Sequence, residues 1–412
     1  MTTQSSTLAP VRRGAEEQLL ADLNDWLMTR THDERFIDNI FVELCARLRA
    51  AGVPVARATL NFHIQHPQFM GASILWRTGF AEAELRTFEH GAQDSSAYVN
   101  SPVREIHLGA ERIRRRLVAG RPGEPGANYP IYEELRGEGL TDYVAWPIKH
   151  TLGGRHVVSF AADREAGFRE AEIALLAGLV PALSLVSEVR LKNRLARTLL
   201  ETYVGPHASA EILAGAITRG SGTTVSAAIL VCDLRDFTSI SELWPRDDVI
   251  ELLNGYFDAV CGPVEAHGGE ILKFIGDGLL AIFPLDRPTA ARDLLMAVSE
   301  AQAAMVRLNE GHVARGRAPL GYGMGIHVGD VMYGNIGTRR RLDFTVIGPA
   351  VNVASRLEAL TKELARPVLL SRAFADLARC PAGLESLGSY PLRGLGEPLE
   401  VLALNDVRCA ME

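Results

Sequence analysis

The sequence has few cysteines and no long uninterrupted apolar run. Its five cysteines, at positions 45, 232, 261, 380 and 409, form no CxxC pair and are odd in number. This usage excludes a disulfide framework and is typical of free thiols in a reducing compartment. The stretch MTTQSSTLAPVRRGAEEQ contains no apolar region of the kind found in secretory signals. Residues 173–186, the longest apolar candidate, are short for a bilayer and contain Pro181, so they predict a buried helix. We therefore expect a cytoplasmic protein without membrane contact.

The chain also lacks an excess of positive charge. Its 43 Lys and Arg residues are outnumbered by 50 Asp and Glu residues, which leaves a net charge of −7. This charge disfavours nucleic acids and anionic membrane surfaces as partners, because both attract basic proteins. Apolar residues make up 47% and charged residues 23% of the chain, as is typical of soluble globular proteins. A chain of 412 residues exceeds one ordinary hydrophobic core, so we expect two domains.

The N-terminal half predicts helices followed by a mixed α/β region. Residues 15–27 and 34–52 carry apolar residues at spacings of three and four, and Gly52 is a predicted helix C-cap. The period then changes toward two, which predicts strands over 55–65, 71–78, 142–150 and 155–163, with shorter helices between them. From Arg169 a helical pattern continues to residue 202.

This order of elements resembles a GAF-type sensor domain. The resemblance implies a small-ligand pocket, while a PAS-like module, an unrelated α/β module and a dimerisation or spacer domain remain open. His63 and His66 are spaced to share one face of a predicted strand, either as ligands of a metal or haem or as a surface pair. We expect a helical segment at 1–40, the GAF-like domain at 41–188 and a signalling helix or linker at 189–222.

From residue 225 onward, apolar strands and amphipathic helices alternate. The pattern predicts these elements in order: strand 225–232, helix 238–267, two paired strands within 269–284, helix 287–309, a strand at 321–329, a strand and helix within 344–361, and closing strands near 385–405. Alternation over this length predicts one α+β domain at 223–405.

Two stretches of this domain present carboxylates next to apolar strands. Asp233 and Asp236 lie in CDLRDF (232–237), and Asp277 lies in the GDG turn of GEILKFIGDGLLAIF (269–283). A strand end and a hairpin tip can bring Asp233 and Asp277 together. Paired carboxylates of this kind hold two hard divalent cations for in-line attack at phosphorus. Taken alone, Asp277 would be interpreted as an ordinary residue of a type I′ turn in preference to a ligand.

Four stretches in this half resemble the catalytic domain of class III adenylate/guanylate cyclases: VCDLRDFTSISE, GGEILKFIGDGLLAIF, GMGIHVGDVMYGNIG and FTVIGPAVNVASRLE. The resemblance implies a ferredoxin-like fold, cyclisation of a nucleotide and two divalent cations, Mg²⁺ or Mn²⁺. It makes Asp233 and Asp277 the metal ligands, together with the backbone carbonyl of Leu234. Asp236 stands where the family often has glycine, and we interpret it as the N-cap of the helix that follows.

The same resemblance implies the nucleotide contacts. Lys273 would address the base, and a donor-only side chain suits the acceptor N1 of adenine rather than the protonated N1 of guanine. Thr345 takes the second base-reading position. Many adenylate cyclases carry Asp there, whereas a bacterial-type subgroup carries Thr. Asn352 and Arg356, at i and i+4 of one helix, would orient the ribose and stabilise charge at phosphorus. Arg393 matches a lysine that contacts the terminal phosphates.

The family builds each active site between two catalytic domains, so a chain with one such domain implies a homodimer with shared sites. ATP is the expected substrate, and a small molecule or protein is expected to regulate the N-terminal domain. The subgroup resemblance also implies responsiveness to bicarbonate or CO2. The alternatives are a guanylate or relaxed-specificity cyclase and a silent nucleotide-binding regulatory module. The intact set of matched residues argues against the silent module.

Overall fold

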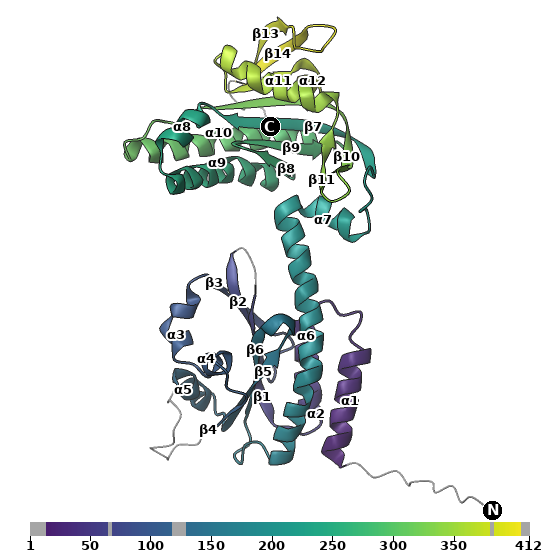
Figure 1. Cartoon of the computed structure of the whole chain (residues 1–412), viewed down its shortest axis with the longest axis vertical. Helices are drawn as coiled ribbons and strands as arrows, with labels where there is room; N and C mark the ends of the chain where they lie inside the picture. Colours follow the sequence, from purple (N-terminus) through teal and green to yellow (C-terminus); the bar gives the residue numbers. More distant parts are fainter. Residues whose placement is uncertain (1–13, 65–67, 118–128, 380–382, 405–412) are drawn as a thin grey trace, which may run out of the picture. The chain divides into compact units, whose positions relative to one another are not determined.

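The computed structural model describes residues 14–64, 68–117, 129–379 and 383–404. The chain forms two compact units, Met1–Leu199 and Leu200–Glu412. Helix α6 (Glu170–Val204) passes from one unit into the other, close to the predicted span of 169–202 (Figure 1).

A six-stranded antiparallel sheet lies at the centre of the first unit, in the order β3-β2-β1-β6-β5-β4. Its strands are β1 (Val55–His63), β2 (Phe69–Arg77), β3 (Glu84–Glu89), β4 (Ile113–Arg116), β5 (Asp142–Lys149) and β6 (Arg155–Ala162). The alternating sequence pattern predicts four of them. It misses β3 and β4, because β3 is exposed along its whole length and β4 has the sequence IRRR, so neither alternates.

Three helices cover one face of this sheet, namely α1 (Ala15–Thr29), α2 (Ile37–Ala50) and α6 (Figure 1). Leu27 of α1, Phe41 of α2 and Phe160 of β6 belong to the same buried core. The predicted boundary at residue 40 therefore falls inside one continuous core. Helix α2 ends as predicted, since Gly52 adopts φ +85° and its N–H donates to the Arg49 carbonyl at 3.0 Å.

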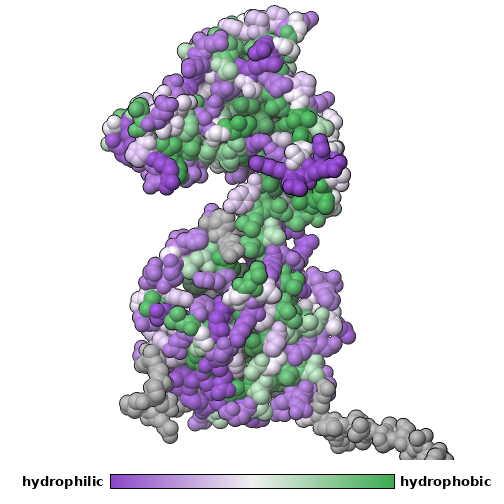
Figure 2. All heavy atoms as spheres, viewed as in Figure 1, coloured by the Kyte–Doolittle hydropathy of each residue, from purple (hydrophilic) through white to green (hydrophobic). Residues whose placement is uncertain are grey.

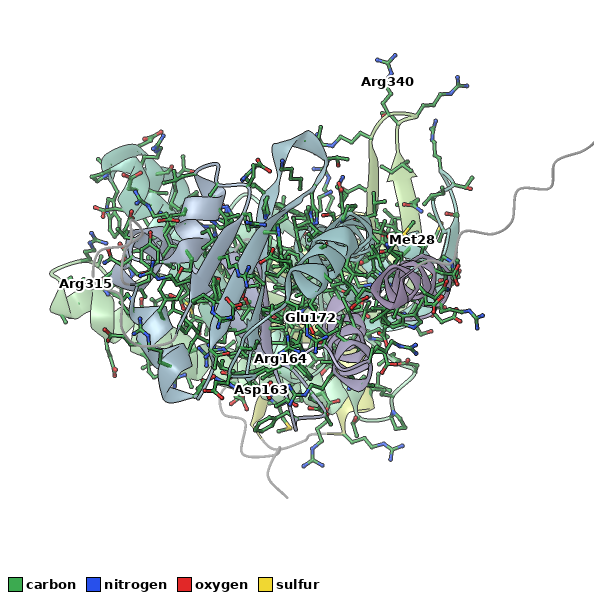
Figure 3. All side chains as sticks on the ribbon, turned by 90° about the horizontal axis from the view of Figure 1, so that it is seen from below. Met28, Asp163, Arg164, Glu172, Arg315 and Arg340 are labelled. Carbon is green, nitrogen blue, oxygen red and sulfur yellow. The ribbon has the colours of Figure 1, made fainter. Side chains whose placement is uncertain are left out.

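Helix α6 is long and apolar enough to cross a membrane by length and composition, and half of its most apolar window is buried within the protein. Leu176, Leu179 and Leu183 pack in the core of the first unit, which confirms the buried helix predicted for 173–186. At its start, Glu172 accepts hydrogen bonds from the Arg164 guanidinium at 3.0 Å and the Arg169 N–H at 2.7 Å. Figure 3 shows Arg164 and Glu172 grouped beside this helix.

The described part of the opposite face carries short helices: η1 (Ala92–Asp94), α3 (Ser96–Val99), α4 (Pro102–His107) and α5 (Pro130–Gly137). The turn η2 (Thr151–Gly153) joins β5 to β6 where the sequence predicts it. His63 ends β1 and its ring stacks on His107 at 5.6 Å, while His66 lies outside the described residues. Among the described residues, no three or more His, Cys, Asp or Glu side chains are grouped to hold a metal ion. The histidine metal site therefore stays a prediction.

The second unit is built on a larger sheet, in the order β13-β14-β12-β10-β7-β9-β8, with β11 paired to β10. The strands are β7 (Gly222–Leu234), β8 (Glu270–Ile275), β9 (Gly278–Pro284), β10 (Tyr322–Gly337), β11 (Leu342–Ile347), β12 (Val368–Ser371), β13 (Leu384–Tyr390) and β14 (Leu399–Leu404). Antiparallel neighbours in the order β10-β7-β9-β8, connected β-α-β-β-α-β along the chain, form a ferredoxin-like core. The predicted α+β fold of this half is confirmed.

Helices cover both faces of the second sheet: α7 (Pro206–Leu213), α8 (Phe237–Leu243), α9 (Arg246–Ala266), α10 (Ala290–Ala314), α11 (Pro349–Glu363) and α12 (Arg372–Ala378). The main core lies between the sheet and α9 and α10, and a second cluster lies under α7 and α11. The prediction of one helix over 238–267 is wrong. Pro245 holds the preceding Trp244 in extended backbone, at φ −98° and ψ 150°, and this separates α8 from α9.

Candidate active site

Two carboxylates meet at one end of the second sheet. Asp233 is the penultimate residue of β7, and Asp277 lies in the two-residue turn between β8 and β9. Gly276 opens this turn with φ +66°, a conformation that glycine adopts without strain. Oδ1 of Asp233 lies beside Gly278, the residue after Asp277, since a Cβ added to Gly278 would be 3.0 Å from it. The structure therefore brings together the two residues that the sequence predicts as metal ligands.

The charge of this pair is not compensated by the protein. Burial, and then the charge of Asp277, raise the pKa of Asp233 to about 6. Among the described residues, neither carboxylate forms an ion pair with a Lys, Arg or His side chain. Two acceptor-only carboxylates without a cationic partner fit hard divalent cations, whose remaining ligands can be water and substrate phosphates. Leu234 follows Asp233 as the last residue of β7, and its carbonyl stays a predicted third ligand.

Asp236 does not act as the predicted N-cap. It precedes α8, but its side chain accepts no hydrogen bond from the first helical turn. Its backbone lies in the left-handed region, at φ 57° and ψ 24°, whereas a capping side chain requires extended backbone to reach the free N–H groups. The carboxylate instead lies 3.6 Å from Lys362, and both side chains are largely exposed.

The residues that the resemblance predicts to contact the base, Lys273 and Thr345, lie on β8 and β11. Together with Asp343 they are called the base-directed group. Lys273 of β8 forms an ion pair with Asp343 of β11, a residue that the sequence analysis does not identify. Thr345 lies two positions beyond Asp343 and therefore on the same side of β11. The Thr345 side chain is nearly buried, while Lys273 and Asp343 are 40% and 53% exposed. Because these two residues are 70 positions apart, no local pattern links them.

The phosphate-directed residues gather around α11. Pro349 occupies the first turn of this helix, where its fixed φ and missing N–H cost nothing. Asn352 and Arg356 lie one turn apart on it, Asn352 exposed and Arg356 half-buried. A Cβ added to Gly394 would lie 3.3 Å from a terminal nitrogen of Arg356, so the exposed Arg393 and the Arg356 guanidinium lie in the same neighbourhood.

The charges of Asp233 and Asp277 also act on a third carboxylate, Glu358 of α11. Burial, and then the charge of Asp233, raise its pKa to about 7, while Arg235 opposes the shift. Glu358 is two residues beyond Arg356, and side chains two apart on a helix face different directions. The spacing that links Asn352 to Arg356 therefore does not identify Glu358 as a neighbour of the carboxylate pair.

One copy of the second unit thus contains three groups of site residues: the Asp233–Asp277 pair, the Lys273–Asp343–Thr345 group, and the α11 group of Asn352 and Arg356. No contact between the carboxylate pair and the α11 arginine is found among the described residues. A ferredoxin-like core that carries an adjacent carboxylate pair fits a domain that binds divalent cations. Residues 221–402 match the family model of the adenylate and guanylate cyclase catalytic domain. Residues 221–402 therefore form a domain of the class III adenylate/guanylate cyclase family.

Several relatives share this domain. The chain is 33% identical over 243 residues to an adenylate cyclase of Anabaena cylindrica, a match that covers 57% of this chain and 46% of the relative. It is 31% identical over 171 residues to adenylate cyclase 1 of Rhizobium meliloti, which covers 41% of this chain and 26% of the relative. The chain thus spans less than half the length of these curated relatives.

Solved structures of both specificities resemble the second unit. The adenylyl cyclase CyaB of P. aeruginosa is 28% identical in sequence to this chain, with a TM-score of 0.42. The match covers 47% of this chain and 100% of the CyaB chain. The guanylyl cyclase Cya2 is 30% identical, with a TM-score of 0.40 and coverages of 44% and 93%. The family match lies in the second unit, and the GAF-type assignment of the first unit stays a prediction.

Proposed function

We propose that the chain is an adenylate cyclase that converts ATP into 3′,5′-cyclic AMP and pyrophosphate. The observation that carries this proposal is the Asp233–Asp277 pair, two adjacent carboxylates without a cationic partner among the described residues. Asp233, Asp277 and the Leu234 carbonyl would hold two divalent cations, Mg²⁺ or Mn²⁺. Bound cations would lower the pKa of the attacking ribose hydroxyl and neutralise charge on the leaving pyrophosphate.

The reaction is an in-line displacement at the α-phosphorus of ATP. The ribose 3′ oxygen forms a bond to the α-phosphorus, the bond from that phosphorus to the oxygen bridging to the β-phosphate breaks, and the hydroxyl proton passes to water. Arg356 would stabilise the charge that develops on the phosphoryl oxygens, since a guanidinium stays protonated and can donate to two oxygens. Asn352 would orient the ribose, and Arg393 would contact the terminal phosphates.

Base selection would rest on Lys273 and Thr345. The ammonium group of Lys273 only donates, so it matches the unprotonated N1 of adenine and opposes the N1–H of guanine. The ion pair to Asp343 holds this ammonium group on the side of β11 that also carries Thr345. The Thr345 hydroxyl both donates and accepts, so discrimination by that residue is weaker than by a carboxylate. A guanylate or relaxed-specificity cyclase is the alternative, because relatives of both specificities share the domain.

A homodimer with two shared sites would complete the machinery. No contact joins the carboxylate pair to Asn352 or Arg356 among the described residues of one copy, and each group would meet its counterpart from a second copy. Phe274 and Ile275, next to Asp277, are 53% and 60% exposed, and Ile347 at the end of β11 is 47% exposed. Figure 2 shows apolar residues in green over the middle of the second unit, where β7, β8 and β9 run. Burial of this surface would favour association.

The first unit would act as the regulatory module of a cytoplasmic enzyme, and bicarbonate or CO2 is a further expected effector. The decisive test is an assay of the purified full chain with ATP or GTP and with Mg²⁺ or Mn²⁺, in which cyclic AMP and cyclic GMP are separated by chromatography. We expect cyclic AMP from ATP at a higher rate than cyclic GMP from GTP. Preference for GTP would support the alternative cyclase, and no product with either nucleotide would replace the proposal with a silent nucleotide-binding module.

A further inference from the structure

The first unit contains a cavity of about 410 Å³ that shares no lining residue with the candidate active site. Its floor is the face of the sheet opposite α1, α2 and α6, and its walls come from η1, α3, α4 and α5. This volume lies within the roughly 300–1,000 Å³ of small-molecule sites. Most of the lining is apolar, and it includes the aromatic rings of Phe88 and Tyr98.

The alternation of β1 explains why the floor of this cavity is polar. Ala58, Leu60 and Phe62 point to the helical core, where all three are buried. The alternate residues Thr59 and Asn61 point to the opposite face and line the cavity. A sheet face that only had to pack against the short helices would need no polar residues there, because buried polar groups cost free energy unless they are hydrogen-bonded.

These polar side chains form a connected network. The hydroxyl oxygens of Thr59 and Ser159 lie 2.6 Å apart across β1 and β6, and Nδ2 of Asn61 donates to the Thr59 hydroxyl at 3.0 Å. The Tyr143 hydroxyl interacts with Ser159. Among the described residues, the second amide hydrogen and the carbonyl oxygen of Asn61 have no partner. Asn61 can therefore offer one donor and one acceptor to a ligand.

The charges around the cavity cancel. Arg57 has a buried side chain and forms ion pairs with Glu134 at 2.7 Å and Glu138 at 2.8 Å. Arg86, also on the lining, forms an ion pair with Glu84 at 2.6 Å. His107 adds no charge at neutral pH, because burial is the main effect lowering its pKa to about 4. Both arginines among the described lining residues are thus paired with carboxylates, which disfavours an anionic ligand.

We propose that this cavity binds an uncharged, largely apolar ring compound whose edge carries an adjacent donor and acceptor that pair with the Asn61 carboxamide. The aromatic and aliphatic lining takes the rings, and the Thr59–Ser159 network holds the Asn61 amide in place. The compensated arginines select against phosphates and carboxylates. Nucleotides and other anions are therefore poor ligands of this site.

The test measures binding of three probes to the full chain by titration calorimetry, without nucleotide or metal. The probes are 2-quinolone, which carries the donor–acceptor edge, N-methyl-2-quinolone, which lacks the donor, and 2-naphthoate, an anion of similar size. We expect saturable binding of 2-quinolone to one site per chain, at least about tenfold tighter than either other probe. N-methylation removes a hydrogen bond to the partly buried Asn61 carboxamide, and the charge of 2-naphthoate must be desolvated. The result is independent of cyclase activity, so it separates this proposal from the proposed function.

Variants test the role of the amide. Asn61→Leu should bind 2-quinolone and N-methyl-2-quinolone with equal affinity, whereas Asn193→Leu, a control on the exposed surface of α6, should retain the tenfold difference. Circular dichroism confirms that both variants fold, and if Asn61→Leu does not fold, the three probes on the unaltered chain decide alone. The proposal is overturned if no probe saturates, if 2-naphthoate binds tightest, or if N-methylation changes nothing.

Discussion

The Lys273–Asp343 ion pair offers the sharpest test of how this site selects its base. Replacing Asp343 by Asn keeps the shape of the side chain and removes the charge that holds the Lys273 ammonium group. Both side chains are about half exposed, at 40% and 53%, so water screens the pair. Such pairs contribute at most about 1 kcal/mol to the free energy of unfolding. The melting temperature should therefore fall by only about 2–4 °C.

The effect on nucleotide selection should be larger than the effect on stability. A Lys273 side chain without its partner samples several rotamers, so adenine must order it on binding. We expect Asp343→Asn to lower kcat/KM for ATP about tenfold, which corresponds to about 1.4 kcal/mol. Most of this change should appear in KM, because a contact to the base is made in both the ground and the transition state. The ratio of ATP to GTP efficiency should fall accordingly.

Steady-state kinetics with both nucleotides, at saturating Mn²⁺, measure these quantities. Asp286→Asn is the matched control, since it removes the same charge from an exposed position after β9, outside the base-directed group. An unchanged ATP to GTP ratio in Asp343→Asn would refute a role in positioning Lys273. A higher efficiency with ATP would show instead that Asp343 competes with adenine for the ammonium group.

Three further outcomes are expected. Asp277→Ala should leave the circular dichroism spectrum unchanged and reduce turnover below about a tenth of wild type, because the metal-directed pair loses one of its two carboxylates. Asp233→Ala and Arg356→Ala should each be nearly inactive. A mixture of the two variants after subunit exchange should recover about a quarter of wild-type activity, since half the dimers are heterodimers with one intact site of two. Activity at background in verified heterodimers would contradict the shared-site mechanism. Gly325→Ala should destabilise the second unit by about 1–3 kcal/mol in urea titrations, because the added Cβ would lie 2.1 Å from the Ala354 carbonyl oxygen of α11; an unchanged midpoint would show that α11 is free to shift.

Features that depend on neighbours in the sequence could be predicted from the sequence. The period-two stretches became β1, β2, β5 and β6, because alternation places one side of a strand against a core. Gly52 ends α2, and Gly276 opens the tight turn that contains Asp277. Both positions need the left-handed conformation that glycine adopts without strain. The proximity of Asp233 and Asp277 was predicted from a strand end, a hairpin tip and the family resemblance together, and it depends on the pairing of β7 with β9.

Other features were decided only when distant segments packed together. Lys273 meets Asp343 because β8 and β11 approach each other across 70 residues, and a charge pair on two strands has no signature in either. Asp236 lost its predicted capping role to a left-handed backbone conformation, which depends on how β7 turns into α8. The cavity above Asn61 exists because short helices leave space over a sheet face that pattern alone would fill. Local sequence sets the type of each element, whereas partners and empty space depend on long-range packing of side chains that no window of the sequence contains.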